Sequence, residues 1–467
     1  MTAAAAAAPA KPIDMTRVVL TSLAASSIEW YDFFIYGTAA ALVFPKLFFA
    51  ASLPPAVAQL AAFSTFAVGF IARPVGGVVF GHFGDRVGRK NALVTALLMM
   101  GLATTAVGLL PGYATLGVLS PLLLIVLRFI QGLAVGGQWG GAVLIAIENA
   151  PPSRRGFFGS FAQMGVPAGV VLGNAVFLIM GATVPPDSFL AWAWRVPFLL
   201  SIVLVILALY IQLKLEDTAD FQAAQALAAK QHEDEAAALA AQTGVSIAQA
   251  KAKIRAAQGS PILKVLAKNP KEILLAAGAF VAANGTFYLM ITYAVAYSTA
   301  TLKVPKTTIL WAVVIASALS APVLPITAWI SDRVGRRGVF MTGAFLAALW
   351  CAWPFFHLLD SARFPLMLAA IAGGLIFNST MYGCQAALMT ELFSTEFRYS
   401  GASLGYQIGA ILGGGFAPLI ATALYAHYHS SAPIAVYMTG LCLVSLLSVF
   451  LLAETHSKAH RDAMAVT

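Results

Sequence analysis

Two copies of one short polar motif organise this chain: GHFGDRVGRK at residues 81–90 and AWISDRVGRR at residues 328–337. A second pair of positions repeats at nearly the same separation, since Glu148 and Glu391 each precede a loop arginine. Each motif copy lies between two long apolar segments. An internal repeat of this length predicts two structurally related halves within one chain.

The composition predicts a membrane protein. Of the 467 residues, 60% are hydrophobic and 10% are charged, with a mean hydropathy of +0.83. A soluble domain carries roughly 25% charged residues, so this chain cannot cover itself against water. Its apolar residues form long blocks, and a segment isolated in lipid must satisfy its backbone hydrogen bonds internally. We therefore expect an all-α membrane protein, not a β-barrel.

Twelve apolar segments are long enough to span a bilayer. They run near 18–45, 57–80, 91–111, 117–148, 157–181, 189–213, 273–301, 308–330, 339–359, 364–391, 400–425 and 433–453. This spacing predicts an N-terminal six-helix half (1–213), a linker (214–272) and a C-terminal half with a short tail (273–467). The linker alone has a soluble composition, and part of it could form amphipathic surface helices. A tether between the halves is favoured over an independent binding domain.

The basic residues predict the orientation. With both termini inside, 21 of the 28 lysines and arginines fall on the cytoplasmic side and five on the outer side. This asymmetry follows the positive-inside rule. The net charge of +9 is thereby explained without nucleic acid as a partner. The first apolar segment is too long for a cleaved signal peptide and is expected to remain as a helix.

Neither metal binding nor redox chemistry is indicated. The three cysteines, Cys351, Cys384 and Cys442, lie in different apolar segments and lack C-x-x-C spacing. Buried small hydrophobic side chains are the expected role.

The repeated motif suits a conformational latch. Its glycines permit a tight turn, and its arginines can donate to carboxylates and to helix C-termini. Topology-setting charge is the alternative role for each residue. The predicted loop-latch residues are Gly81, Asp85, Arg86, Gly88, Arg89, Glu148, Asp332, Arg333, Arg336, Glu391 and Arg398.

The repeated motif resembles the signature of the major facilitator superfamily, over the whole chain. Further stretches resemble its metabolite:proton symporter family: SIEWYDFFIYG at 27–37, ARPVGG at 72–77, RFIQGLAVGGQWGGA at 128–142 and ELFSTEFRYSGASLGYQ at 391–407. That family implies proton-driven uptake of shikimate, 2-oxoglutarate, citrate, proline or betaine. Ala328 departs from the pattern because it replaces the first glycine of the second motif copy.

Ionisable residues inside the membrane cost about 2.5–3.5 kcal/mol each on insertion scales, so each requires a reason. Glu29 and Asp32 lie three apart on the first segment, with Tyr36 continuing the same face. Arg73 and Arg128 lie at comparable depths, which predicts ion pairs in the first half. We expect Asp32, Glu29 and Arg128 to couple proton binding to transport, because a substrate carboxylate would compete for Arg128. A static buried salt bridge is the alternative.

The second half has no counterpart of Arg128, since Ile371 occupies the equivalent position. It offers neutral polar and aromatic groups, which suit a small hydroxylated ligand, although membrane packing is an alternative role for each aromatic. The predicted substrate-binding residues are Arg128, Arg73, Tyr36, Gln131, Gln138, Trp139, Gln163, Asn284, Tyr288, Asn378, Tyr382, Gln385, Tyr406 and Gln407.

No catalytic residues are expected. Nucleophile-elbow, zinc-protease and phosphate-binding motifs are all missing from the sequence, which disfavours an enzyme and an ATP-driven pump. A channel is disfavoured because no pore-filter segment is evident. We expect a monomeric importer of a small organic acid in the bacterial inner membrane, with protons as coupling ion and no other cofactor. Uptake of a zwitterionic osmolyte, or a non-transporting solute sensor, are the alternatives.

Overall fold

The computed structural model describes residues 15–87, 89–148, 152–214, 233–234, 236–247, 249, 266–393 and 398–455. Within these ranges, the side chains of 15–18, 21, 25, 81–87, 89–93, 137–148, 152, 208, 211–214 and 398–400 lie outside the description. Most of the predicted linker does too, so its role stays a prediction. Most of the described residues are helical, and no strand occurs among them.

The first half contains six long helices: α1 (Met15–Leu42), α3 (Pro55–Val87), α4 (Arg89–Leu109), α6 (Leu119–Glu148), α7 (Arg155–Thr183) and α9 (Val196–Lys214). Short helical turns connect them: α2 (Phe44–Leu47), α5 (Tyr113–Leu116), η1 (Pro152–Arg154), α8 (Pro186–Ala191) and η2 (Ala193–Arg195). All six long helices overlap the predicted apolar segments.

The second half repeats this plan with three interrupted spans. Its helices are α13 (Pro270–Tyr288), η3 (Leu289–Tyr293), α14 (Ala294–Ala300), α15 (Lys306–Ser320), α16 (Val323–Val334), α17 (Arg336–Ala352), α18 (Pro354–Leu359), α19 (Phe364–Leu392), α20 (Arg398–Gly409), η4 (Ala410–Gly415), α21 (Ala417–Tyr428) and α22 (Ala432–Leu451). The segments η3 and η4 are π-helical, a geometry that is frequent at functional sites.

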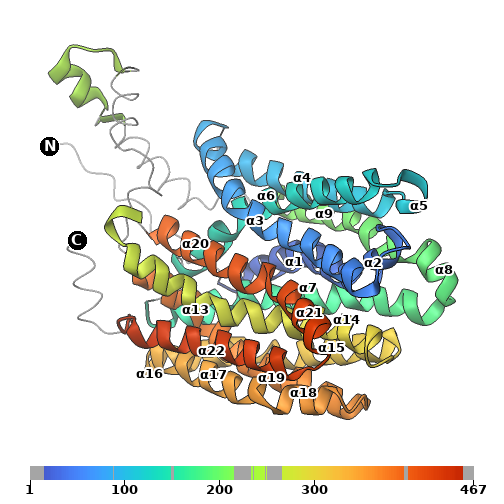
Figure 1. Cartoon of the computed structure of the whole chain (residues 1–467). Coiled ribbons are helices and arrows are strands. Elements are labelled where there is room, and N and C mark those ends of the chain that lie inside the picture. Colours follow the sequence, from blue (N-terminus) through green and yellow to red (C-terminus); the bar gives the residue numbers. More distant parts are fainter. Residues whose placement is uncertain are drawn as a thin grey trace.

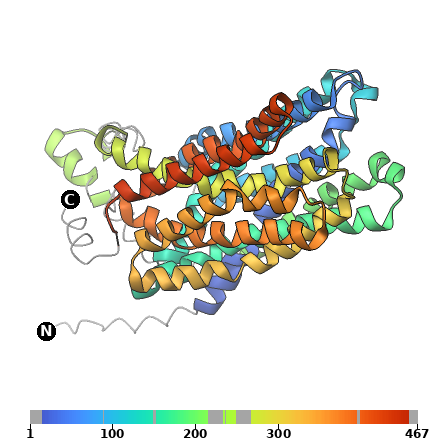
Figure 2. The same cartoon turned by 60° about the horizontal axis from the view of Figure 1, so that its bottom comes forward.

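The long helices lie side by side in one bundle, with the first half against the second (Figure 1). Eight described helices are long and apolar enough to cross a membrane, and α4 and α9 contribute shorter apolar stretches. With α1 and α17, these make the twelve-helix architecture that the sequence predicts. We name the end where α1 begins and α22 ends the inner end, because the basic residues predict that it faces the cytoplasm (Figure 2).

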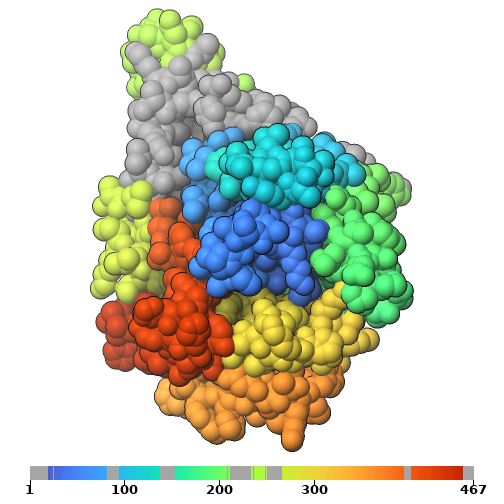
Figure 3. All heavy atoms as spheres, turned by 45° about the vertical axis from the view of Figure 1, so that its right-hand side comes forward, coloured from blue at the N-terminus to red at the C-terminus, as the bar shows by residue number. Residues whose placement is uncertain are grey.

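The halves meet along a continuous interface. Helix α7 packs on α15, α16 and α19, and α3 packs on η4 and α21. Helix α1 contacts η3 and α14, while α6 contacts α20. The green of α7 and α8 consequently lies against the yellow of α14 and α15 at the outer end (Figure 3).

Glycines bring α3 and α6 into close contact, which positions the arginines described below. A Cβ atom at Gly136 would overlap the carbonyl oxygen of Arg73, and one at Gly76 would overlap that of Leu133. Small residues permit such backbone approach between membrane helices.

We therefore expect Gly136→Ala to lower the free energy of unfolding by about 1–3 kcal/mol, because the added methyl must push the helices apart. The thermal unfolding midpoint of the purified protein in detergent measures this. Gly440→Ala is the matched control, since nothing lies within 4 Å of the position that its methyl group would take. Equal midpoints for the two variants would contradict the expectation.

Candidate functional site

Arg73 of α3 is fully buried against aromatic rings. Its guanidinium carbon lies 4.4 Å from the ring centroids of both Phe33 and Phe70, and 5.7 Å from that of Trp30. Within the described part of the chain, its Nε, Nη1 and Nη2 atoms have no hydrogen-bond partner that meets normal geometry. Cation–π contacts therefore stabilise a buried cation whose donors remain available.

Arg128 of α6 occupies a neighbouring aromatic box. Its guanidinium carbon lies 4.2 Å from the centroids of Phe33 and Tyr36 and 4.9 Å from that of Phe66. Nη1 donates to Gln131 at 3.1 Å, while Nε and Nη2 have no partner among the described residues. Phe33 thus contacts both arginines and places two cations beside one ring.

Hydrogen bonds hold this box in place. The Gln131 amide donates to Thr104 on α4 at 2.8 Å, and the Tyr36 hydroxyl donates to Thr65 on α3 at 2.8 Å. Gln131 and Tyr36 therefore orient Arg128 from within the first half. Neither Gln131 nor Tyr36 lines the cavity between the halves that is described below.

The predicted ion pairs are not formed in this conformation. Among the described residues, neither Arg73 nor Arg128 has a carboxylate oxygen within the 4.0 Å of a salt bridge. Aromatic rings occupy the positions around both guanidinium groups that carboxylates would take. The prediction was wrong here because sequence spacing gives the depth of a side chain but not the direction in which its helix face points.

The two predicted carboxylates face different neighbours. Asp32 is buried beside the preceding residue, Tyr31, and beside Ser201 of α9. Its Oδ1 atom has no hydrogen-bond partner among the described residues. Glu29 is only partly buried and interacts electrostatically with Arg73. No salt bridge joins either carboxylate to an arginine among the described residues.

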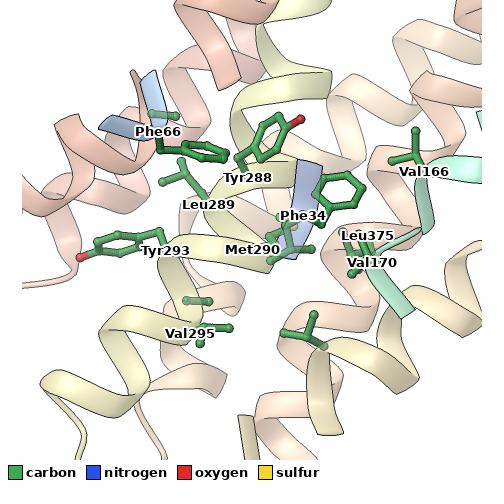
Figure 4. Close-up of a cluster of buried hydrophobic side chains, with 14 of the residues drawn as sticks. Phe34, Phe66, Val166, Val170, Tyr288, Leu289, Met290, Tyr293, Val295 and Leu375 are labelled. Carbon is green, nitrogen blue, oxygen red and sulfur yellow. The ribbon is translucent and has the colours of Figure 1, made fainter. Parts of the chain in front are cut away.

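A small cavity of about 20 Å³ lies between the halves, enough for one or two water molecules. It is lined by Trp30, Val166, Pro167, Ala283, Asn284, Phe287, Tyr288, Ser320, Leu324, Asn378, Ser379, Tyr382 and Tyr406. Figure 4 shows how Phe34 of α1, Val166 of α7 and Tyr288 of α13 converge from both halves. The cavity is therefore bordered by packed side chains from both halves.

Five of the predicted substrate-binding residues line this cavity: Asn284, Tyr288, Asn378, Tyr382 and Tyr406. Arg73 adjoins it, because Trp30 packs against its guanidinium group and Tyr288 and Tyr406 interact with it electrostatically. Asn378 also supports the fold, since its amide donates to Ala283 at 2.8 Å and to Thr286 at 3.0 Å.

Three predicted glutamines are buried with unsatisfied amides. Both polar atoms of Gln163, Gln385 and Gln407 lack partners among the described residues. Gln385 follows Asn378 and Tyr382 at helical spacing, so it extends the cavity-lining face of α19 toward the inner end. The side chains of Gln138 and Trp139 lie outside the described residues.

Trp30, Phe287 and Ser379 were missed as cavity residues. Trp30 is adjacent to Glu29 in the sequence, but a tryptophan in an apolar helix gives no sign of whether it meets lipid or a ligand. Phe33 was missed as the support of both arginines for the same reason.

The inner end is closed by a contact between the halves. Asp332 of α16 accepts hydrogen bonds from the backbone N–H groups of Gly156 at 3.0 Å and Phe157 at 2.8 Å, in the first turn of α7. The N-cap residue Arg154 provides no side-chain cap. Helix α7 is thus capped by a carboxylate from the other half, where the helix dipole favours negative charge.

A charge network holds Asp332 in position. Arg336 pairs with Asp332 at 2.6 Å and with Glu391 at 3.2 Å, and its Nη1 donates to Ser331 at 2.9 Å. Glu454, which no sequence motif indicated, accepts from the backbone N–H groups of Arg336 and Arg337. Asp332, Arg336 and Glu391 of the predicted loop latch therefore lie in one charge network, and their role as a latch stays a prediction.

The remaining latch predictions have different outcomes. Arg333 does not join the network, since its guanidinium group lies 3.7 Å from the ring centroid of Trp329. Gly88 and the side chains of Gly81, Asp85, Arg86, Arg89, Glu148 and Arg398 lie outside the described residues, so their roles stay predictions. A glycine at position 328 would let a neighbouring helix approach closely. Gly156 of α7 permits that approach instead, since its added Cβ would lie 3.1 Å from the Ala328 carbonyl oxygen.

We expect Gly156→Ala to open the inner end without changing any charge. The methyl would lie 2.8 Å from Asp332 Oδ1 and 2.7 Å from Arg336 Nη1, so the cap could not form. The alkylation rate of a cysteine introduced at Gln163 should rise about tenfold, equivalent to a bias of about 1.4 kcal/mol toward the inner-open state. Gly338→Ala is the control because its methyl would meet nothing within 4 Å. An unchanged rate would contradict the latch.

A contact also joins the halves at the outer end. The ammonium of Lys306 at the start of α15 lies 3.3 Å from the ring centroid of Phe189 on α8, and its side chain approaches Gly181 of α7. A cation–π contact therefore joins the halves opposite the inner latch. Contacts between the halves therefore lie at both ends of the central cavity.

Sequence comparison places the chain among membrane transporters. It matches the family described as "Sugar (and other) transporter" over residues 18–464. It is 38% identical to the shikimate transporter of Escherichia coli over 446 residues, covering 94% of each chain. It is 30% identical to the proline/betaine transporter of the same species over 455 residues, covering 96% of this chain and 85% of that protein.

Structural comparison supports the architecture. The crystal structure of the D-xylose-proton symporter superposes with a TM-score of 0.71 at 16% sequence identity, covering 95% of this chain and 99% of that one. At this identity the likeness concerns the fold. The chain is therefore a multi-pass membrane transporter, not an enzyme, and it belongs to the sugar (and other) transporter family of the major facilitator superfamily.

Proposed function

We propose that this protein is a proton-coupled symporter that imports a small hydroxylated organic acid, of which shikimate is the first candidate. The observation that carries the proposal is a set of buried guanidinium nitrogens that make no hydrogen bond of normal geometry among the described residues: three of Arg73 and two of Arg128. A buried cation without a partner is costly. Binding a carboxylate there would supply the missing hydrogen bonds.

The neutral polar groups suit the rest of such a ligand. Asn284, Ser379 and the tyrosines around the cavity can exchange hydrogen bonds with hydroxyl groups, and the amides of Gln163 and Gln385 offer further donors and acceptors. The 38% identity with a shikimate transporter agrees with this chemistry. The ligand must enlarge the cavity as it binds, because the volume of about 20 Å³ leaves room only for water.

A zwitterionic osmolyte is the second candidate, since four of the relatives are named as transporters of proline and betaine. Its carboxylate would suit Arg73 equally well. A quaternary ammonium prefers open aromatic faces, but Phe33, Phe66 and Phe70 already hold guanidinium groups here. This occupancy favours the acid.

Location and coupling belong to the same proposal. The protein would reside in the bacterial inner membrane with both termini in the cytoplasm, as the basic residues predict. It would act as a monomer in the lipid bilayer, with the proton as coupling ion and no other cofactor, and it would not bind nucleic acid.

Uptake into proteoliposomes tests the proposal. The purified protein would be assayed with labelled shikimate, 2-oxoglutarate, citrate, proline and betaine, with and without an inward proton gradient. Gradient-stimulated accumulation of an acid supports it. Uptake of proline or betaine alone would replace it with the second candidate, and uptake without gradient dependence would remove the proton. Binding without any flux would indicate a sensor.

A further inference from the structure

We propose that Phe70 is a positioning residue for the substrate: the second half seats its ring, and the ring holds the guanidinium group of Arg73 where a substrate carboxylate can bind. The inference rests on the proposed function, in which Arg73 is the ligand of that carboxylate. It gives the second half a part in positioning an arginine that belongs to the first half.

The first step is the seat of the Phe70 ring, which we name the glycine notch. It is formed by Gly414 and Gly415 at the end of the π-helical segment η4. A Cβ atom at Gly414 would lie 2.7 Å from Cε1 of Phe70, and one at Gly415 would lie 3.0 Å from Cβ of Phe70. Phe70 is completely buried. Its side chain, carried by α3 of the first half, therefore fills space that two glycines of the second half leave open.

The second step is the contact between this ring and the cation. Phe70 precedes Arg73 by three residues, so both lie on one face of α3. The guanidinium carbon of Arg73 lies 4.4 Å from the ring centroid of Phe70, within the range of a cation–π interaction. The cavity residue Tyr288 meets Phe70 edge to face, with ring centroids 5.2 Å apart and an interplanar angle of 89°. One ring thus links the glycine notch, a cavity residue and Arg73.

The third step is what holds the guanidinium group of Arg73. Its nitrogens make no hydrogen bond of normal geometry among the described residues, so its orientation depends on the rings around it. The rings of Phe33 and Phe70 lie closest, each with its centroid at 4.4 Å, and Trp30 follows at 5.7 Å. Phe33 and Trp30 belong to α1. Phe70 is the ring of the three that occupies the glycine notch, so the second half acts on Arg73 through it.

The fourth step is the consequence for binding. A guanidinium group binds a carboxylate at two points through a planar fork, so its orientation matters. A ligand-binding group that is already held in its bound orientation saves the cost of ordering it. The notch can seat the Phe70 ring only while η4 packs on α3. Arg73 is therefore held for the carboxylate while the halves are joined there, and it binds the carboxylate less tightly when they separate.

The test measures uptake by the full-length protein in proteoliposomes, with labelled shikimate or with whichever acid of the panel the wild type accumulates. In Gly414→Ala the added methyl should displace the ring and raise KM about tenfold, the scale of a lost cation–π contact. The maximal rate should stay within about threefold of the wild type. Phe70→Leu, which removes the ring, should have the same effect. Gly440→Ala is the matched control, since its methyl meets nothing within 4 Å.

Two comparisons separate positioning from packing. The double variant Gly414→Ala/Phe70→Leu should match Phe70→Leu alone, because both changes remove the same contact. In an Arg73→Gln background, Gly414→Ala should change kcat/KM by less than about twofold, since no guanidinium group remains to be positioned. Initial uptake at low substrate concentration gives kcat/KM. Phe70→Leu carries the second comparison if Gly414→Ala does not fold.

Three results would overturn the inference. The first is a wild-type KM in both Gly414→Ala and Phe70→Leu, and the second is a double variant whose effects multiply. The third is an equal loss of kcat/KM in the wild-type and Arg73→Gln backgrounds, which would reduce Phe70 to a packing residue.

Failure of the proposed function gives a different result. If the wild type accumulates no acid, the proposed function fails, and the position of Arg73 is then tested without a substrate. The rate at which phenylglyoxal modifies Arg73, followed by peptide mass spectrometry, should rise severalfold in Gly414→Ala and in Phe70→Leu, because the displaced or shortened side chain no longer covers the guanidinium group. It should stay at the wild-type level in Gly440→Ala. An unchanged rate in both notch variants would overturn the inference.

Discussion

Replacing Arg73 by glutamine should lower kcat/KM for uptake about 100-fold, which corresponds to about 2.7 kcal/mol of lost binding. Truncating one partner of a buried, hydrogen-bonded charge pair costs about 2–5 kcal/mol or more. The loss should appear in KM as well as in the maximal rate, because Arg73 would hold the substrate in its ground state. Initial rates over a range of substrate concentrations measure it.

The same substitution should not destabilise the protein. Arg73 is a buried cation without a described ion-pair partner, so its removal relieves a desolvation cost. We expect the thermal unfolding midpoint of Arg73→Gln to equal or exceed that of the wild type. Arg73→Lys should remain impaired, since lysine keeps the charge but lacks the planar fork that binds a carboxylate at two points.

Arg363→Gln is the matched control, because Arg363 is an exposed arginine of the outer surface. Its kinetics should be unchanged. Wild-type uptake by Arg73→Gln would show that the unpartnered guanidinium nitrogens are not ligands. A large fall in stability would instead show that Arg73 is a structural residue.

Replacing Arg336 by alanine should lower the free energy of unfolding by about 3–5 kcal/mol, the cost of breaking a buried ion pair from one side. Arg336 is fully buried and joins Asp332 at 2.6 Å and Glu391 at 3.2 Å. Its loss leaves two carboxylates near each other without a cation between them. Chemical or thermal unfolding in detergent measures the change.

Arg333→Ala is the control for this prediction. Arg333 lies three residues before Arg336 in the sequence, but it packs on the exposed ring of Trp329. Its removal should change stability by less than about 1 kcal/mol. If the two alanine variants unfold alike, the network around Arg336 contributes little, and the inner latch would depend on the α7 cap alone.

The sequence by itself determined the twelve spans and the two halves. It also identified the charged residues that gather at the inner end. Lipid forces each apolar segment to satisfy its own backbone, so segment length and hydropathy suffice to locate helices. The contact of Asp332, Arg336 and Glu391 was predictable because the second copy of the charged motif and Glu391 both lie where apolar segments end at the inner end.

Only the tertiary structure decided which groups meet at the centre. Depth along a helix follows from counting residues, and it placed Glu29, Asp32, Arg73 and Arg128 at similar levels. The rotation of each helix does not follow, because helices that are apolar on all sides carry no polar stripe to show which face points inward. Packing therefore selected aromatic rings as partners of the arginines and brought Asp332 to the first turn of a helix in the other half.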